Sequence, residues 1–218
     1  MARSDEQNRA ASARSRENLL QAAIEVFAER GVAGASVAEI TTRAGVAQGL
    51  VSYHFGGKEQ LVAAVIDRWF ETVLGFAHST GTPDEILAAI IDDALRATAY
   101  AVPLQRVIIA IQQQPATHRL FAESEERHAE GATAAEDAVR AVFRARGASD
   151  PALEEIMLRS TLEGVFVKYS VFGDTYPLEA ARRWVHARYG LPEPTAPLRP
   201  ELAAPEGEPR PRASGAAV

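Results

Sequence analysis

Residues 36–61, SVAEITTRAGVAQGLVSYHFGGKEQL, contain two short helix-like segments separated by a glycine. Ser36 followed three residues later by Glu39 is the pattern of a capping box, so we expect a helix to begin there and to end near Ala44. Gly45 would make the turn, and a second short helix is predicted over about 47–54. Two short helices joined by a tight glycine turn are typical of a helix-turn-helix, whose second helix is sized to enter a DNA major groove.

The two faces of this motif would present different chemistry. A buried seam between the helices needs apolar groups, which are supplied by Ile40, Ala44, Val46, Val51 and Phe55. The opposite side gathers an amide, a bare backbone, a hydroxyl and a phenol, from Gln48, Gly49, Ser52 and Tyr53. Groups of this kind suit base edges and phosphates, so we predict that this face contacts DNA.

Lys58 lies in the first turn of the helix expected after Gly57. A cation at this end of a helix opposes the macrodipole and is mildly unfavourable by itself. The position makes sense if a phosphate docks there, bound by the ammonium and by the free N–H groups together. The alternative is a surface lysine without a role, and beside a helix-turn-helix we favour the phosphate contact.

The rest of the chain is also helical in its apolar period, without an alternating strand pattern or a repeat. We therefore predict an all-α fold of about nine helices. Outside the motif they cover 16–30 (with Gly31 as the stop), 58–78, 83–99, 104–113, 116–146, 151–172 and 177–189. Residues 15–60 are expected to form the DNA-binding domain, with the motif at 36–55, and residues 61–190 a larger helical domain.

Both ends of the chain are predicted to lack packed structure. Residues 1–14 read as a flexible, arginine-containing arm. Residues 191–218 hold seven of the twelve prolines, and this composition predicts a disordered tail.

Composition excludes several classes of protein. The 218 residues are 47% hydrophobic and 24% charged, which is typical of a folded soluble chain. No apolar run approaches the roughly 18 residues of a membrane span, and the N-terminus has no apolar signal region. The absence of cysteine excludes disulfides, thiol catalysis and cysteine metal sites. We expect a cytoplasmic protein with no membrane partner.

Charge is distributed unevenly along the chain. The net charge is −6, yet residues 1–60 carry seven Lys or Arg and seven Asp or Glu, so the whole deficit lies after residue 60. This asymmetry fits a head that tolerates a polyanion on an acidic body.

The candidates for catalysis are weak. Ser52 and His54 are two residues apart on a helix, so they point in different directions and cannot form a nucleophile–base pair. Glu125-x-x-His128 has the spacing of a carboxylate di-iron motif, but such sites need the motif twice and two further glutamates. We predict no enzyme activity, no catalytic residue, no metal and no cofactor.

The stretch from about Arg16 to Ile66 resembles the DNA-binding domain of the tetracycline-repressor (TetR) family of bacterial transcription regulators. The matching residues are Ala22, Ala23, Phe27, Gly31, Ser36, Val37, Ile40, Ala44, Gly45, Val46, Gly49, Tyr53, His54, Phe55, Lys58, Glu59 and Leu61. Leu50 and Ser52 depart from the commonest family pattern, which has Thr or Ser and then Tyr. This pairing is similar to the branch that contains the choline-responsive betaine repressor.

The resemblance implies a set of DNA contacts. Ser36 and Lys58 would contact phosphates, and Arg43 would reach a base or a phosphate. The residues in or beside the groove would be Gln48, Gly49, Leu50, Ser52 and Tyr53, and His54 would contact the backbone or brace the motif. Arg14 and Arg16 would touch the adjacent backbone or minor groove. The missing tyrosine at Ser52 removes one phosphate contact, whereas Leu50 can meet a thymine methyl group.

The resemblance also implies a ligand-responsive repressor that binds a palindromic operator as a homodimer and is released by a small-molecule effector. One short recognition helix reads few bases, while two heads about 34–36 Å apart read a palindrome. The alternative is a helical small-molecule-binding protein that has lost DNA binding.

Two sets of residues in the body follow from these expectations. The candidates for the effector pocket are polar or aromatic residues in the middle helices: Gln105, Gln112, Phe121, Glu125, His128, Phe143, Thr161, Phe166 and Tyr169. The candidates for the dimer interface lie on the last two helices: Ile156, Ser160, Gly164, Leu178, Ala181, Trp184 and Val185. For each apolar residue of the second set, packing inside the subunit is an equally good interpretation.

Overall fold

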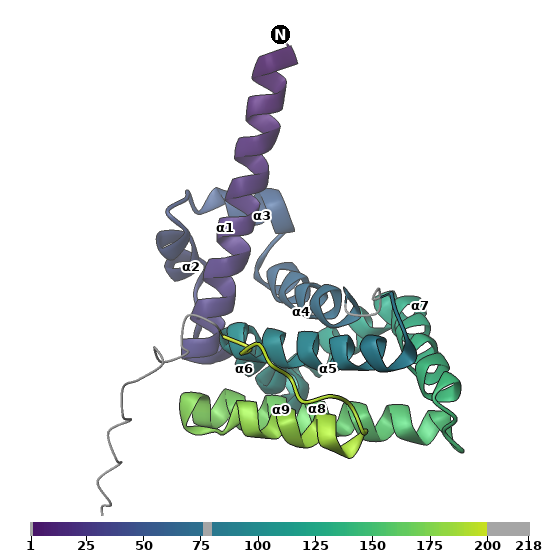
Figure 1. The fold of residues 1–218 in the computed structure, drawn as a ribbon. Helices are drawn as coiled ribbons and strands as arrows, with labels where there is room; N and C mark the ends of the chain where they lie inside the picture. The colour runs from purple at the N-terminus through teal and green to yellow at the C-terminus, as the bar shows by residue number, and fades with distance from the viewer. Residues whose placement is uncertain (1, 76–79, 200–218) are drawn as a thin grey trace, which may run out of the picture.

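The computed structural model describes residues 2–75 and 80–199, with the side chains of 2–5 left aside. Within this part the chain is helical, with a 3₁₀ turn (η2, Gly173–Thr175) after α8 and no strand (Figure 1). The helices are α1 (Ala2–Gly34), α2 (Val37–Ala44), α3 (Gly49–Phe55), α4 (Lys58–Leu74), α5 (Pro83–Tyr100), α6 (Val102–Gln113), α7 (Pro115–Ala145), α8 (Pro151–Phe172) and α9 (Leu178–Arg188). The prediction of an all-α fold is confirmed.

The head is built on one buried face of α1. Phe27 of α1, Ile40 of α2 and Val51 of α3 are each at most 2% exposed and belong to the same apolar cluster. Burying a side chain of this size stabilises the fold by about 1.5–3 kcal/mol, so the seam predicted from the sequence holds the motif together. The cluster also contains α4 and α6 residues such as Leu61 and Ile108, so the head shares its core with the first helices of the body.

The turn of the motif has the geometry that its glycine predicts. Gly45 ends α2 in the left-handed region, with φ of 66°, and its N–H bonds back to the carbonyls of Thr41 and Thr42. The N–H of Val46 also donates to the Thr41 carbonyl, at 3.0 Å, so the turn bonds the carbonyls at the C-terminal end of α2. Gly31, predicted as a helix stop, interrupts α1 with φ of 70°.

Gly45→Ala should lower the free energy of unfolding by about 1–2 kcal/mol, because a side chain in the left-handed region meets its own backbone. Nothing lies within 4 Å of the added Cβ, so conformational strain is the whole cost. Urea unfolding measures it. Gly49→Ala is the matched control: Gly49 is the first residue of α3, and alanine favours a helix, so this change should not destabilise the fold. Equal effects of the two changes would contradict the interpretation.

The body consists of the six helices α4–α9. α7 packs on α4 and α8, and α5 packs on α8 and α9. Figure 1 shows α8 and α9 at the end of the molecule opposite to the N-terminus. A second apolar cluster fills this part, with Leu87 and Ile91 of α5, Phe143 of α7 and Leu158 of α8 each at most 2% exposed.

The structure corrects the predictions for both ends of the chain. Helix α1 begins at Ala2, so residues 2–14 are helical rather than a flexible arm. The reason is local: this segment contains no glycine or proline, and four of its thirteen residues are alanine and three are arginine, which favour helices.

At the other end, residues 191–199 form an extended strap on the body. The prediction of a disordered tail is wrong for this part, because Leu191 and Leu198 are buried in the second cluster. Two backbone groups of the strap are also bound: the Ala196 carbonyl accepts from Arg182 Nη1 at 2.6 Å, and the Leu198 N–H donates to Glu179 at 2.7 Å. Residues 200–218 lie outside the described part of the chain.

No single described helix is long and apolar enough to cross a membrane. The pair α5 and α6 passes by length and composition, but the two helices are bent by 91° and carry core residues of both clusters.

Candidate nucleic-acid interface

The exposed face of α3 carries the polar groups that the sequence predicts there. Gln48, Gly49, Ser52 and Tyr53 are all exposed, and Tyr53 is the most exposed large hydrophobic side chain of the head, at 74%. Val51 is 1% exposed and anchors the opposite face in the core. The helix therefore presents one short polar surface to solvent.

Leu50 and His54 lie between the two faces of α3. Leu50 is half-buried and packs on the core of the head, so its side chain is only partly available to a thymine methyl group. The His54 ring lies edge-on to Tyr53, with 4.8 Å between ring centroids. Its Nε2 atom is buried and has no hydrogen-bond partner in the structure. A histidine placed in this way braces Tyr53.

Lys58 connects the motif to α4. Its Nζ donates to the Ala35 carbonyl at 2.6 Å, immediately before Ser36, whose Oγ accepts from the N–H of Glu39 at 3.1 Å and so caps α2. An ammonium has three donors, so two remain for a phosphate. Lys58 thus has a structural bond in addition to the phosphate contact that the sequence predicts.

Arg43 is held against α1. Its two terminal nitrogens donate to the Glu29 carboxylate at 2.6 and 2.7 Å. These hydrogen bonds lower the pKa of Glu29. Because both side chains are on the surface, the pair contributes little to stability, and the guanidinium can exchange Glu29 for a DNA phosphate at small cost.

The structure does not bring the nine effector candidates into one site. Phe121 packs on Phe70 of α4, with 5.7 Å between ring centroids, whereas Phe143 packs on Tyr189 in the other cluster. Tyr169 is 3% exposed and donates to Asp174 at 2.9 Å. Among the other effector candidates, Gln112 and Glu125 are exposed, and Thr161 and Phe166 are half-buried.

Gln105 is the effector candidate with an unsatisfied group. It is 3% exposed, and its amide nitrogen donates to the Thr98 carbonyl at 3.1 Å. Its Oε1 atom is buried without a hydrogen-bond partner in the structure. A buried acceptor of this kind costs free energy until a donor reaches it.

His128 belongs to a polar cluster between α4 and α7. Its ring stacks on Phe70 at 4.8 Å, and its Nδ1 lies 2.9 Å from the Ser124 carbonyl. Asp67 of α4 accepts from the hydroxyl of Ser124 at 2.9 Å and from Arg127 at 2.8 Å. Asp67 and Ser124 are not among the predicted site residues, since nothing in the sequence indicates that α4 and α7 are neighbours.

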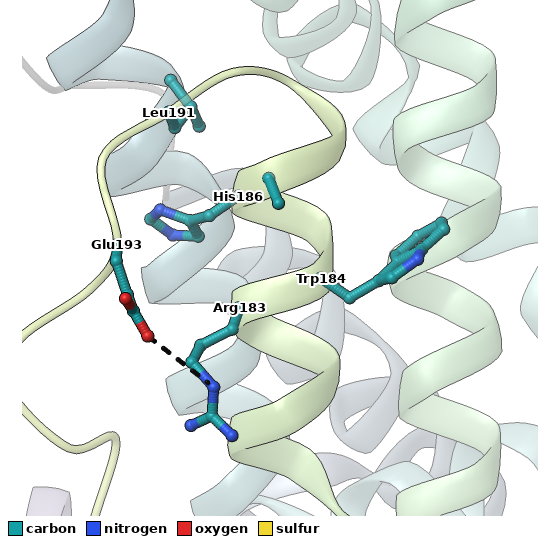
Figure 2. Close-up of a pocket in the computed structure, with 6 residues that line it drawn as sticks. Arg183, Trp184, His186, Leu191 and Glu193 are labelled. Carbon is teal, nitrogen blue, oxygen red and sulfur yellow. Dashed lines mark ion pairs between the residues drawn. The ribbon is translucent and has the colours of Figure 1, made fainter.

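Two cavities lie elsewhere in the body. One of about 390 Å³ is lined by Arg183, Trp184, His186, Ala187, Leu191 and Glu193, between α9 and the strap. In Figure 2, Arg183 and Glu193 lie on one side of α9 and Trp184 on the other. The second, of about 360 Å³, is lined by apolar residues of α5 and α7: Pro83, Ile86, Ile90, Ala138, Ala141, Val142 and Ala145. None of the nine effector candidates lines either cavity.

The dimer candidates divide by exposure. Leu178 and Val185 are buried inside the subunit, and Ala181 packs partly against them. Four candidates remain exposed: Ile156, Ser160, Gly164 and Trp184. The same side of α8 exposes further apolar residues, namely Leu153, Met157, Val167, Val171 and Phe172. We call these nine residues the α8–α9 surface.

The described residues contain no group of three His, Cys, Asp or Glu side chains that is placed to hold a metal. Ser52 is exposed and His54 half-buried.

The head of the chain matches a known protein family. Residues 19–65 match the family described as bacterial regulatory proteins, tetR family. A transcriptional repressor of the helix-turn-helix type from Mycobacterium tuberculosis is 44% identical over 72 residues, which are 33% of this chain and 38% of that protein. The chain therefore matches well under half the length of this relative.

A betaine-branch regulator is also among the relatives. BetI 1 from Chromohalobacter salexigens is 35% identical over 82 residues, covering 35% of this chain and 41% of that protein. Among solved structures, the regulator FadR from Bacillus subtilis, in complex with stearoyl-CoA, has a TM-score of 0.62 at 21% identity and covers 78% of this chain and 94% of that one. This likeness shows that the body has the same fold.

Proposed function

We propose that this chain, which carries the DNA-binding domain of the tetR family of bacterial regulatory proteins, is a transcriptional regulator that binds a palindromic operator as a homodimer and releases it when a small molecule binds the body. The observation that carries the proposal is the surface of α3. Its exposed side offers hydrogen-bonding groups and a phenol, while its other side is anchored in the core, so the helix can enter a groove as a rigid unit.

The α8–α9 surface supports the homodimer. Its exposed apolar residues follow one another at helical spacing along α8, and Ser160 and Gly164 on the same side allow close approach of a second helix. Continuous apolar surface of this kind marks an interaction site rather than ordinary solvent-exposed surface. A second copy related by a twofold axis would cover it and would place two heads on one operator.

Contacts between head and body support release by an effector. α4 begins with Lys58 at the motif and reaches Asp67 and Phe70, which contact α7. Glu59 at the start of α4 also pairs with Arg119 of α7. A ligand that displaces α7 therefore moves the helix that carries the head, and binding shifts the population towards heads that are spaced wrongly for the operator.

We propose repression rather than activation, because the Mycobacterium tuberculosis relative is named a transcriptional repressor. The unpaired Oε1 atom of Gln105 is the contact that we propose for a hydrogen-bond donor of the effector, since it lies among α5 and α6 next to the head core.

The proposal is tested by a gel-shift titration with the DNA upstream of the gene and with a selected pool of random duplexes. We expect a specific complex whose affinity falls steeply as salt rises, because phosphate contacts release counterions. Absence of binding to both DNA samples at low salt would leave the alternative, a helical ligand-binding protein without DNA binding.

Tyr53→Ala should weaken operator binding about tenfold or more, because a dimer loses two contacts that are each worth about 1 kcal/mol. Fluorescence anisotropy with labelled operator measures the change. Tyr53 is a cleaner probe than Lys58, because Lys58→Ala also removes the bond to the Ala35 carbonyl and loosens the head. Tyr100→Ala, which removes an exposed tyrosine of α5, is the matched control and should bind like the wild type. Equal affinities of the Tyr53 variant and the wild type would refute the contact.

A further inference from the structure

A buried histidine of α9 lies between the strap and α5. His186 is 3% exposed, and its ring contacts Pro192 of the strap on one side and Asp92 of α5 on the other. Figure 2 shows the ring on the same side of α9 as Leu191, whereas Trp184 lies on the other side. The proposed function does not use His186, since this residue belongs to neither the exposed face of α3 nor the α8–α9 surface.

Both ring nitrogens of His186 face hydrogen-bond acceptors. Nδ1 lies 2.9 Å from the Pro192 carbonyl oxygen, which can only accept, and Nε2 lies 2.9 Å from Asp92 Oδ1. The Asp92 carboxylate also accepts from Arg182 through both of its oxygens, at 2.7 and 2.6 Å, so it is ionised and has no proton to donate. A neutral imidazole has one N–H group, whereas an imidazolium has two. The two contacts therefore require His186 to carry both protons.

The charges around His186 fit an imidazolium. The charged side chains that surround it and its partners, on α5, α9 and the strap, are Asp92, Glu179, Arg182, Arg183 and Glu193. Arg182 is 2.6 Å from Asp92 and 3.5 Å from Glu179, and a second guanidinium pairs with the carboxylate of the strap at 3.9 Å. Among the described side chains, the ion pairs of α8 are made within α8 and with α7. The group thus contains three carboxylates and two guanidiniums, and a positive His186 makes it neutral.

Loss of one proton from His186 breaks the contact with the strap. The remaining N–H stays on Nε2, because a hydrogen bond to a carboxylate is roughly twice as strong as one to a neutral carbonyl. Nδ1 then presents a lone pair to the Pro192 carbonyl oxygen, and two acceptors at 2.9 Å repel each other. The bond to Asp92 is therefore kept and the bond to the strap is lost.

Only the start of the strap depends on the His186 ring. The far end is held by other groups, through the bonds of the Ala196 carbonyl and the Leu198 N–H. At the start, the Leu191 side chain is buried, and the Pro192 carbonyl is bound by the ring. Loss of this bond therefore loosens the start of the strap while the far end stays bound.

We propose that His186 is a protonation-dependent contact, which fixes the start of the strap to α9 in acid and releases it as the pH rises. Histidine side chains change charge between about pH 5 and 8, so the contact responds to ordinary changes of pH. The strap forms one wall of the cavity of about 390 Å³ beside α9, so its release changes this cavity with pH. The inference goes beyond the proposed function and does not depend on DNA binding.

The direction of the pH effect follows from which form makes the extra bond. Because the protonated ring binds the strap, the stabilisation is present at low pH and is lost as the pH rises. The same contact needs an ionised Asp92, whose pKa is lowered by Arg182 and His186 against the effect of burial. The strap is therefore held most firmly between the range in which Asp92 takes up a proton and the range in which His186 loses one.

Amide hydrogen exchange of the full-length protein, followed residue by residue at about pH 5.5 and about pH 8.5, tests the proposal. Rates are divided by those of unstructured peptides at the same pH. In the wild type, protection of the Leu191 and Glu193 amides is expected to fall about tenfold from the lower to the higher pH, since one hydrogen bond to a charged group is lost. The Leu198 amide, which donates to Glu179, should keep its protection.

His186→Gln separates the ring from other titrating groups. Glutamine keeps a donor for Asp92 but has no proton to lose, so the start of the strap should exchange fast at both pH values. His118→Gln is the matched control: it removes an exposed histidine of α7 and should keep the pH dependence of the wild type.

The ring ¹⁵N shifts of His186 in the wild type give a readout that needs no variant. Both nitrogens should carry protons while the strap is protected, and one should lose its proton over the pH range in which exchange becomes faster. Equal protection of the wild-type strap at both pH values would overturn the inference. So would a neutral ring beside a protected strap, or a pH dependence of the His186→Gln variant equal to that of the wild type.

Discussion

Ile156→Glu on α8 is expected to convert the proposed dimer to a monomer at micromolar concentration. Ile156 is 45% exposed in the subunit and belongs to the α8–α9 surface, in the N-terminal half of α8. In a twofold interface the substitution occurs in both copies, so two carboxylates enter an apolar contact together. Burying unpaired charges costs several kcal/mol, which corresponds to a loss of dimer affinity of more than about a hundredfold.

Sedimentation velocity over a range of concentrations measures this change. Ala122→Glu, at an exposed position of α7, adds the same charge away from the α8–α9 surface and should leave the dimer intact. Trp184 gives a second readout, because it is 61% exposed in the subunit and is covered only in the dimer. Its emission should shift to longer wavelength in the Ile156 variant. A variant with the dimer affinity of the wild type would place the interface elsewhere.

The affinity for the operator should decrease when the dimer dissociates. A monomer carries one head, and the affinity gained by joining two heads on adjacent half-sites is lost with the interface. The Ile156 variant should therefore lose specific binding although its α3 face is unchanged. If the monomeric variant kept wild-type affinity for the operator, the proposal of two heads on a palindrome would be wrong.

Asp92→Ala is expected to lower the free energy of unfolding by about 3–5 kcal/mol, because it removes the closest partner of the buried Arg182 guanidinium and leaves only Glu179, at 3.5 Å. The Asp92 carboxylate accepts from Arg182 at 2.7 and 2.6 Å and from His186 at 2.9 Å. The side chains of Arg182 and His186 are 4% and 3% exposed. Both also reach the strap, through the carbonyls of Ala196 and Pro192.

Chemical unfolding at fixed protein concentration measures this cost. Asp93→Ala is the matched control: it removes the neighbouring carboxylate, whose partner Arg96 is largely exposed, and should cost less than about 1 kcal/mol. If Asp92→Ala cost no more than Asp93→Ala, the network would not be a determinant of stability.

The effect of Asp92 should depend on pH in a defined direction. Burial by itself raises the pKa of Asp92. The hydrogen bonds from Arg182 and His186 lower it by more than burial raises it, so the pKa is below its ordinary value. A lowered pKa means that the stabilisation is complete above the unfolded value of about 3.9 and is lost as pH falls through the folded value. The difference between wild type and Asp92→Ala should therefore shrink in acid.

The local pattern of the chain predicted the head well. Helix starts and stops follow from residues that act on their immediate neighbours: Ser36 caps α2 through the N–H of Glu39, and Gly45 turns the chain with a positive φ. The seam of the motif follows from the 3.6-residue period, since it places Ile40 and Val51 on facing sides. Before residue 15 the prediction of a flexible arm is wrong, although the residues themselves favour a helix.

The body was less predictable, because its sites depend on which helices are neighbours. Phe121 and Phe143 are the same kind of residue on the same helix, yet one meets Phe70 of α4 and the other Tyr189 after α9. Likewise, nothing near Leu198 in the sequence indicates that it is buried. The bond from its N–H to Glu179 and the contacts of Arg182 with the strap join residues far apart in the chain.

Local sequence was enough to predict most of the helices, the turn of the motif and the polar face of α3, because caps, glycines and apolar period act within a few residues of the chain. It could not predict that Lys58 binds the Ala35 carbonyl, that Leu178 and Val185 are buried while Ile156 and Trp184 are exposed, or that α1 projects beyond α3. Exposure and pairing are set by the packing of whole helices, to which distant residues contribute as much as adjacent ones.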